Sequence, residues 1–288
     1  MTTLVTDEFV ARQPSAALRP YLTGCAGFRQ AGIAPAVHRG LPSPWLTMIV
    51  TLDDPLVIAQ HPDPGQPAST HDFLLGGLHT VPALITHDGR QSGIQLALTP
   101  LGARTLLRVP AGELAGLDVD ASDVLGRLAG EIRERVLAAP DWDGRFAVLE
   151  QFLADRVRAA SGLRAAEPRP EVSYAWERLH RSRGAVTVAD LAAETGWSAR
   201  YLGEQFRAET GLSPKAGARV IRFDRARRRL LRQAAAGRVS LAGLAVECGY
   251  YDQAHLAREF RELAGCPPSA LLAEEFRNVQ AGHWGDWE

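Results

Sequence analysis

The C-terminal half of the chain contains the same phrase twice. TVADLAAETGWSARYLGEQFRAETGLSP occupies residues 187–214, and SLAGLAVECGYYDQAHLAREFRELAGCPP occupies residues 240–268. The phrases align with one inserted residue, and each places a glycine, Gly196 or Gly249, between two runs of helical period. Glycine most readily adopts the positive φ that a tight turn requires. Each copy therefore predicts helix, turn and helix, the arrangement of a helix-turn-helix unit.

The other matched positions also have structural roles. Thr187 and Ser240 carry the hydroxyl groups that suit a helix N-cap. Small and apolar residues recur at matched positions, and each turn is followed by an apolar pair four residues apart that would face one core. These matched residues are Leu191 and Leu244, Ala192 and Ala245, Leu202 and Leu256, and Phe206 and Phe260.

A longer helix is predicted between the two copies, over the segment SPKAGARVIRFDRARRRLLRQ (residues 213–233). Ser213 suits its N-cap, and Pro214 is tolerated in a first helical turn. About twenty helical residues form a rod of roughly 30 Å. Paired helix-turn-helix units enter successive major grooves roughly 34 Å apart. The spacing therefore fits two DNA-reading units within one chain.

This half of the chain resembles the AraC/XylS family of bacterial transcription regulators, over residues 171–277. The resemblance rests on the second copy and on the connecting segment. The residues that carry it are Ala245, Cys248, Gly249, Tyr250, Leu256, Arg258, Phe260, Gly265 and Pro268, with Arg222, Ala226, Leu230 and Leu231 before them. It implies a sequence-specific DNA-binding transcription regulator.

The resemblance also implies that the second helix of each unit lies in the major groove. In the second unit the base contacts would be Gln253, Ala254, His255, Ala257 and Arg258. Glutamine suits adenine, arginine suits guanine, and alanine suits the methyl group of thymine. Arg261, one turn further on, is expected to contact phosphate. The alternative is that these side chains are only the solvated face of an amphipathic helix.

The first unit departs from the family pattern. Its groove-facing positions are Ala199, Arg200, Gly203 and Glu204, and relatives commonly carry arginine where Glu204 stands. A carboxylate near phosphates is unfavourable unless it accepts from cytosine. We therefore expect the first unit to contact few bases, with Arg200 as its main base-contacting residue. The phosphate contacts expected around it are Arg207, Lys215 and Arg219, with the Arg225–Arg229 cluster either joining them or forming a solvated helix face.

The N-terminal half predicts a different class of fold. Short apolar runs such as WLTMIVTL and SGIQLALTP read as strands, with DDP and HDGRQSG as hairpin turns. Helical periodicity follows over residues 122–139 and 144–160. The whole chain is therefore α+β: a small antiparallel barrel-like or sandwich-like β-domain with helices (1–164), a linker (165–170), an all-α double helix-turn-helix domain (171–277) and a tail (278–288).

The β-domain is expected to bind a small molecule between its strands. The candidate contacts are His38, Arg39 and His79, with Trp45 as an apolar wall, although core or surface roles fit these residues equally. The five histidines of this region lack the spacing of a cupin metal centre, and no catalytic or dinucleotide-binding motif is present. We therefore expect no enzyme activity, metal or cofactor.

Charge and composition fit these assignments. Residues 171–277 hold 17 Lys and Arg against 13 Asp and Glu, whereas residues 1–170 hold 15 against 18, so the positive balance lies in the DNA-binding half. The sequence contains neither a signal peptide nor a membrane-spanning run, which predicts a cytoplasmic protein. The three scattered cysteines predict buried free thiols.

Several partners and alternatives follow. Double-stranded DNA is the expected partner, with a small-molecule effector, RNA polymerase if the protein activates, and a second copy of the chain. The helices of residues 121–161 fit either a subunit interface or packing on their own β-domain. Two other functions remain open, a ligand-independent architectural DNA-binding protein and an enzyme domain fused to DNA-binding helices.

Overall fold

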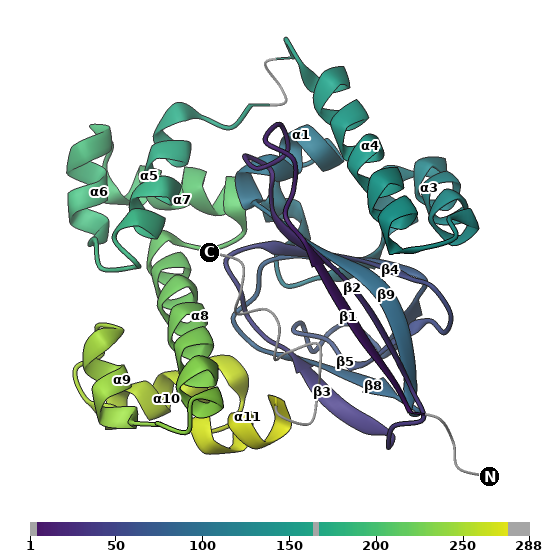
Figure 1. Ribbon diagram of the computed structural model, residues 1–288. Helices are drawn as coiled ribbons and strands as arrows, with labels where there is room; N and C mark the ends of the chain where they lie inside the picture. The colour runs from purple at the N-terminus through teal and green to yellow at the C-terminus, as the bar shows by residue number, and fades with distance from the viewer. Residues whose placement is uncertain (1–4, 164–166, 276–288) are drawn as a thin grey trace.

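The computed structural model describes residues 5–163 and 167–275 (Figure 1). The tail expected at 278–288 and the first residues of the 165–170 linker therefore lie outside the described residues. Antiparallel strands form the N-terminal half and helices form the C-terminal half, as the sequence predicts. No helix in the described parts of the chain combines the length and apolar composition that a membrane span requires.

Within the described residues, ten strands make two antiparallel sheets. One sheet has the order β1-β2-β9-β4-β7-β10 and the other the order β3-β8-β5-β6. The strands are β1 (Thr6–Arg12), β2 (Leu22–Ala31), β3 (Ala36–Gly40), β4 (Leu46–Thr51), β5 (Leu56–Gln60), β6 (Ser69–His71), β7 (Phe73–Gly76), β8 (Ala83–His87), β9 (Arg90–Leu98) and β10 (Asp118–Asp120). Both layers lie side by side in Figure 1.

The two turns that the sequence marks as hairpins do reverse the chain, but neither closes a hairpin. The DDP turn joins β4 to β5, and the HDGRQSG segment joins β8 to β9. In each case the two strands belong to different sheets. The prediction was wrong because turn residues specify where a chain reverses and not which strand becomes its hydrogen-bonded neighbour. These connections fold the domain into two layers.

Successive side chains of β4 point to opposite faces of the six-stranded sheet, and each face packs into a different apolar cluster. Met48 and Val50 of β4 belong to a large apolar cluster that includes residues of the covering helices. Ile49 lies between them and points the other way, because successive side chains of a strand alternate. It joins a small cluster between the sheets, composed of Ile49, Leu56, Ile58, Leu74, Ala83 and Ile85.

Helices cover the outer face of the six-stranded sheet (Figure 1). They are α1 (Ala103–Leu107), α2 (Ala121–Leu125), α3 (Arg127–Ala138) and α4 (Trp142–Ala160), with the short helices η1 (Pro100–Gly102) and η2 (Ala111–Leu114) between strand and helix. The single helix expected over 122–139 breaks at Gly126, whose φ is +58°. The apolar stripes of α3 and α4 pack on their own domain, since Ile132 and Phe146 share the cluster of the strands.

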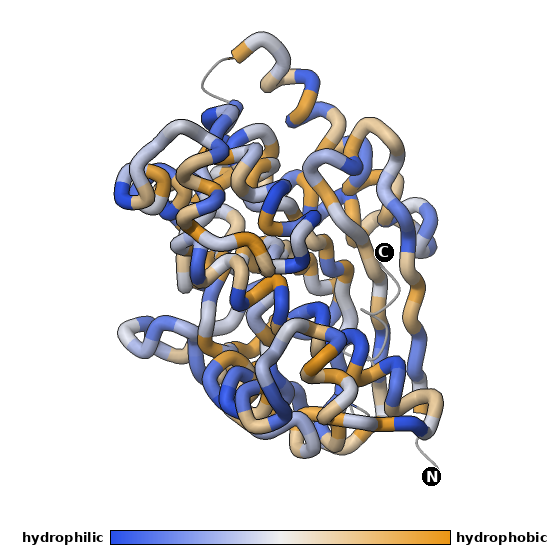
Figure 2. The backbone as a smooth tube through the Cα atoms, turned by 90° about the vertical axis from the view of Figure 1, so that its left-hand side faces the viewer, coloured by the Kyte–Doolittle hydropathy of each residue, from blue (hydrophilic) through white to orange (hydrophobic). Residues whose placement is uncertain are grey.

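The C-terminal half is helical throughout its described length. Its helices are α5 (Pro170–Arg181), α6 (Val188–Thr195), α7 (Ala199–Thr210), α8 (Pro214–Ala235), α9 (Leu241–Glu247), α10 (Gln253–Ala264) and α11 (Pro268–Glu275). Figure 2 shows polar and apolar residues alternating along the backbone in both halves. The apolar cluster that lines the sheet continues into this half through Trp176, Phe206 and Leu212. One hydrophobic core therefore joins the two halves.

Candidate nucleic-acid interface and ligand cavity

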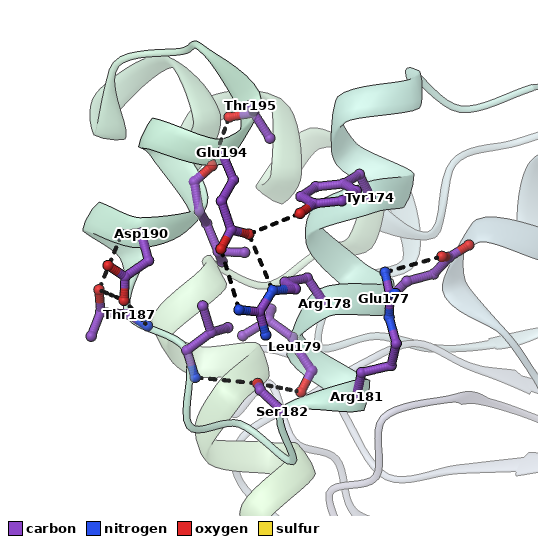
Figure 3. Close-up of polar contacts among 12 residues, drawn as sticks. Tyr174, Glu177, Arg178, Leu179, Arg181, Ser182, Thr187, Asp190, Glu194 and Thr195 are labelled. Carbon is purple, nitrogen blue, oxygen red and sulfur yellow. Dashed lines mark hydrogen bonds and ion pairs between the residues drawn. The ribbon is translucent and has the colours of Figure 1, made fainter.

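The first helix-turn-helix unit is α6 and α7. Thr187 caps α6 in a capping box with Asp190, and Gly196 follows the helix at φ +73°. Arg178 of α5 reaches Glu194 of α6 with two hydrogen bonds of 3.2 Å, as Figure 3 shows. The predicted cap and turn are confirmed, and the Arg178–Glu194 contact holds α5 against α6 of this unit.

The second unit, α9 and α10, repeats this local structure. Ser240 caps α9, and Gly249 has a φ of +75°. Each second helix begins with a side-chain cap, Ser198 for α7 and Asp252 for α10. Each cap directly precedes its helix, so the inserted residue of the second phrase lies in the turn before Asp252, one position earlier than the sequence alignment places it.

An aromatic contact also recurs at matched positions. Trp197 packs edge-on against Tyr201 with ring centroids 4.8 Å apart, and Tyr250 packs edge-on against His255 at 5.3 Å. The first residue of each pair follows the turn glycine. The second lies in the first turn of the second helix of the unit, α7 or α10, which we call the groove helix. The contact therefore fixes the entry to each groove helix in the same way.

His255 is oriented by its own loop. The backbone N–H of Tyr251 donates to His255 Nδ1 at 3.3 Å, and the backbone N–H of His255 donates to Asp252 at 2.6 Å. When Nδ1 accepts, the neutral imidazole carries its proton on Nε2. The ring can then donate one hydrogen bond from Nε2.

The other expected base-contacting residues of α10 lie on its accessible side. Gln253, Ala254 and Arg258 are exposed, and Ala257 is half-buried. Leu256 and Phe260 are fully buried on the opposite side of the helix. Arg261 is also exposed. Neither Arg258 nor Arg261 forms an ion pair with any described residue, so both charges are available to an anion.

The first unit differs in its electrostatics. Arg200 and Glu204 are both exposed, and Arg200 Nε lies 2.9 Å from Glu204 Oε1 in an i,i+4 ion pair. An exposed pair of this kind contributes little to stability, but it places a carboxylate beside the main cation of α7. Gly203 adds no side chain to this surface.

The residues expected to contact phosphate fall into two groups. Arg207 and Lys215 are exposed and have no ion-pair partner among the described residues. Arg219 instead lies between two carboxylates of α10, 2.8 Å from Glu259 and in close contact with Glu262. Arg219 therefore joins α8 to α10, and a phosphate would compete with two carboxylates for its guanidinium group.

The long helix α8 sets the separation of the two units. Ser213 caps it and Pro214 occupies its first turn, as expected. Its 22 residues correspond to a rod of about 33 Å. That length is close to one turn of B-DNA, roughly 34 Å.

A cavity of about 120 Å³ lies between the two sheets, and we call it the inter-sheet cavity. All four residues expected to contact an effector line it: His38, Arg39, Trp45 and His79. Its apolar wall is the small cluster of Ile49, Leu56, Ile58, Leu74, Ala83 and Ile85. The sequence thus identified residues that the structure brings together, although they come from different strands and loops.

Two lining residues that the sequence did not identify come from the DNA-binding half. Arg227 of α8 and Glu275 of α11 reach the inter-sheet cavity, and each is 6% exposed. Arg227 lies 3.4 Å from Asp224 and 3.7 Å from Glu275. The periodicity of α8 alone does not distinguish Arg227 from the neighbouring arginines, so no sequence signal marks it.

Buried polar atoms around this cavity lack hydrogen-bond partners in the described part of the chain. They are His38 Nδ1, Arg227 Nε and Glu275 Oε2. Burial, reinforced by His87, lowers the pKa of His38 to about 4, so the imidazole is neutral at physiological pH. Burial raises the pKa of Glu275, against the opposing effect of Arg227. Unpaired buried polar groups are costly, and a ligand that satisfied them would gain affinity.

Further contacts join the rim of this cavity to the DNA-binding half. Arg39 of β3 binds Glu274 of α11 with both Nε, at 2.7 Å, and Nη2, at 3.2 Å. The guanidinium group of Arg228 lies over the ring of Trp45, 5.5 Å from its centroid. Two of the expected effector contacts are therefore also interdomain contacts.

A buried polar chain lies beside β10. Asp118 is 3.0 Å from His61 Nδ1, His61 Nε2 is 2.9 Å from Ser69 Oγ, and Ser69 Oγ is 2.7 Å from His71 Nε2. The order resembles a hydrolase triad, but the Ser69 hydroxyl is hydrogen-bonded to both imidazoles, His61 on one side and His71 on the other. It joins β6 to β10 as a structural network. Within the described ranges, no group of three or more His, Cys, Asp and Glu is arranged to hold a metal ion.

Comparison with known proteins matches this geometry. Residues 191–274 fit a family model described as a helix-turn-helix domain. A 1.65 Å structure of ToxT from Vibrio cholerae aligns with a TM-score of 0.50 and 11% identity, over 87% of this chain and 97% of that chain. ToxT bound to (E)-4-(8-methylnaphthalen-1-yl)but-3-enoic acid aligns with a TM-score of 0.50 and 10% identity, over 86% and 97%. These likenesses show a shared two-domain fold. A search of curated proteins found no match.

Proposed function

We propose that this chain is a DNA-binding transcription regulator of the AraC/XylS family, and that a small molecule in its inter-sheet cavity controls how it binds DNA. In this proposal residues 1–164 sense the effector, residues 165–170 join the halves, and residues 171–277 bind DNA. The observation that carries the proposal is that side chains of the DNA-binding half, Arg227 and Glu275, line the cavity of the sensing half.

The second helix-turn-helix unit is the main reader of sequence in this proposal. Arg258 and Gln253 are exposed on α10 and suit guanine and adenine. His255 would donate from Nε2, and Ala254 and Ala257 would meet thymine methyl groups. Arg261 would bind phosphate.

The first unit contributes less in this proposal. Glu204 neutralises Arg200 unless it accepts from a cytosine. Arg207 and Lys215 supply phosphate contacts. Arg219 remains a predicted phosphate contact, although its pairing with Glu259 favours a structural role.

The chemistry of the cavity favours a small carboxylic acid as the effector. Its walls are mostly aliphatic, while Arg227 Nε and His38 Nδ1 offer polar contacts. A cavity of about 150 Å³ holds benzene, so a volume of about 120 Å³ limits the ligand to a short chain or at most a single ring. The naphthyl-butenoic acid bound to ToxT supports the same chemical class.

A ligand in this position would change the contacts between the halves. A carboxylate that bound Arg227 of the DNA-binding half while its apolar part lay between the sheets would contact both halves at once. The ligand would therefore have unequal affinity for docked and undocked arrangements, which coupling between the two sites requires. Contact with RNA polymerase and formation of a homodimer stay predictions from the family.

Footprinting on the DNA that flanks the protein's own gene tests the proposal. The purified full chain should protect a discrete site, and benzoate or short fatty acids should change the concentration needed for protection. A protected site that no acid affects would leave a DNA-binding protein without this effector. Uniform protection of any sequence would instead support the architectural alternative.

A further inference from the structure

A second and larger cavity lies between the two halves of the molecule. This interdomain cleft has a volume of about 600 Å³, in the size range of small-molecule sites. One wall comes from α5 and α8 of the DNA-binding half and the other from loops and strands of the β-domain. Neither groove helix contributes a residue to it.

The wall formed by α8 carries a row of positive charge. Arg225, Arg228, Arg229 and Arg232 are spaced i, i+3, i+4 and i+7, which places all four on one face of the helix. Arg183 adds a fifth guanidinium group from the loop after α5. The Arg225–Arg229 cluster thus lies largely against the β-domain, rather than on the groove side.

Carboxylates compensate only part of this charge. Asp224 lies 2.6 Å from Arg228, and Glu247 of α9 contacts Arg229. Among the described residues, neither Arg225 nor Arg183 has an ion-pair partner. Five arginines line the cleft, against the lining residues Glu177 and Asp224 and the neighbouring Glu247, so its field favours an anion with more than one charge.

The opposite wall is uncharged. It is formed by Trp45, Leu101 and the three prolines Pro20, Pro44 and Pro100. Arg228 stacks on Trp45 with its guanidinium carbon 5.5 Å from the ring centroid. A planar ring can pack on such a surface and extend the same stack.

From these two walls we infer that the interdomain cleft is a second ligand site, for an organic polyanion that carries a planar ring, such as a nucleoside phosphate. The phosphates would lie along the arginine row and the ring against Trp45 and the prolines. Arginine forks suit phosphate oxygens geometrically. Because the walls come from different halves, such a ligand also favours the docked arrangement.

The probes that test this site separate its two chemical requirements. Titration calorimetry on the full chain at low salt would compare ATP, inorganic tripolyphosphate and adenosine. ATP is expected to bind most tightly, tripolyphosphate more weakly, and adenosine more weakly still. If ATP and tripolyphosphate bind equally, the ring has no site. If neither anion binds, the inference is wrong.

Matched variants locate the site. Thr23 lines the uncharged wall, and Thr23→Glu should raise the Kd for ATP by about tenfold through charge repulsion, whereas the isosteric Thr23→Gln should leave it nearly unchanged. Arg225→Gln should weaken ATP to a similar extent. Equal ATP binding by the two Thr23 variants would overturn the assignment, because both alter packing in the same way and only one adds charge.

Two further variants exclude other binding surfaces. Arg258→Ala, on the groove helix, should leave ATP binding unchanged. If it weakens ATP as much as Arg225→Gln does, then the anion occupies the DNA surface and the cleft inference fails. Ile58→Trp, in the inter-sheet cavity, should also leave ATP binding unchanged, which keeps this test separate from that of the proposed effector.

Discussion

Gly112 of η2 packs directly against the backbone carbonyl of Ala208 in α7. A Cβ atom at position 112 would lie 2.2 Å from that oxygen, closer than any stable contact. Gly112→Ala should therefore force the halves apart at this point and lower the free energy of unfolding by about 1–3 kcal/mol. Chemical denaturation measures the loss. The same variant should change DNA affinity if docking controls DNA binding.

A control separates docking from the general effect of replacing glycine. Gly130, within α3, has no heavy atom near the position of an added Cβ. Gly130→Ala should be neutral or stabilise the helix by up to about 1 kcal/mol. Equal behaviour of the two variants would show that the Gly112 contact does not hold the halves together.

The two arginines of α10 should have different effects on specificity. Arg258→Ala is expected to cost about 1–3 kcal/mol at the protected site and much less on random DNA, because a base contact is sequence-dependent. Arg261→Ala should weaken binding to the protected site and to random DNA by similar amounts. It should also reduce the slope of log affinity against log salt concentration by about one. Fluorescence anisotropy on both DNAs at several salt concentrations measures this. Parallel losses for Arg258→Ala would reassign that residue to phosphate.

Glu204 is expected to restrain the first unit. Glu204→Gln should release Arg200 from its ion pair, raise affinity for DNA of any sequence and steepen the salt slope by about one. Glu131→Gln, on α3, makes the same change of charge away from the DNA surface and should have little effect. Loss of affinity at the protected site alone would identify Glu204 as a base contact.

The buried imidazole of His38 should make stability depend on pH. Its pKa is about 4 in the folded protein and about 6.5 when unfolded. The unfolded chain therefore binds the proton more readily, and stability falls as the pH is lowered from about 6.5 toward 4. Between pH 7 and pH 5 the loss is about 2 kcal/mol. Denaturation curves of His38→Phe should show a flatter pH profile, and identical profiles would contradict the assignment.

Two adjacent residues of β5 test the inter-sheet cavity. Ile58 is 1% exposed and faces the cavity, whereas Val57 is 37% exposed and faces outward. Ile58→Trp should fill the cavity and abolish any change that benzoate or a fatty acid causes in the footprint. Val57→Trp should retain it. DNA binding without the acid shows whether each variant still folds.

The sequence predicted most accurately the features that depend on residues near one another in the chain. Thr187, Ser198 and Ser240 cap helices by contacts within three residues, and Gly196 and Gly249 turn the backbone where they stand. Period and capping therefore identified both helix-turn-helix units. Gly126 is an exception, because its break in the helix needs only a local φ that glycine permits but does not require.

Features that depend on distant partners were not predictable in the same way. The turns after β4 and β8 do not reveal that the chain changes sheet, because strand pairing is decided by packing. Arg227 and Arg225 have similar sequence surroundings, yet one reaches the inter-sheet cavity and the other lines the interdomain cleft. Only the position of α8 between the two halves separates their roles.

The continuous core has a consequence for how such a protein can change through evolution. Trp176 and Leu212 of one half share their apolar cluster with Leu106 and Leu114 of the other. Exchange of either half with that of a relative would bring together surfaces that were not selected to fit. Specificity for a new ligand or DNA site must therefore arise by substitutions that leave this shared core intact, and not by exchange of whole domains.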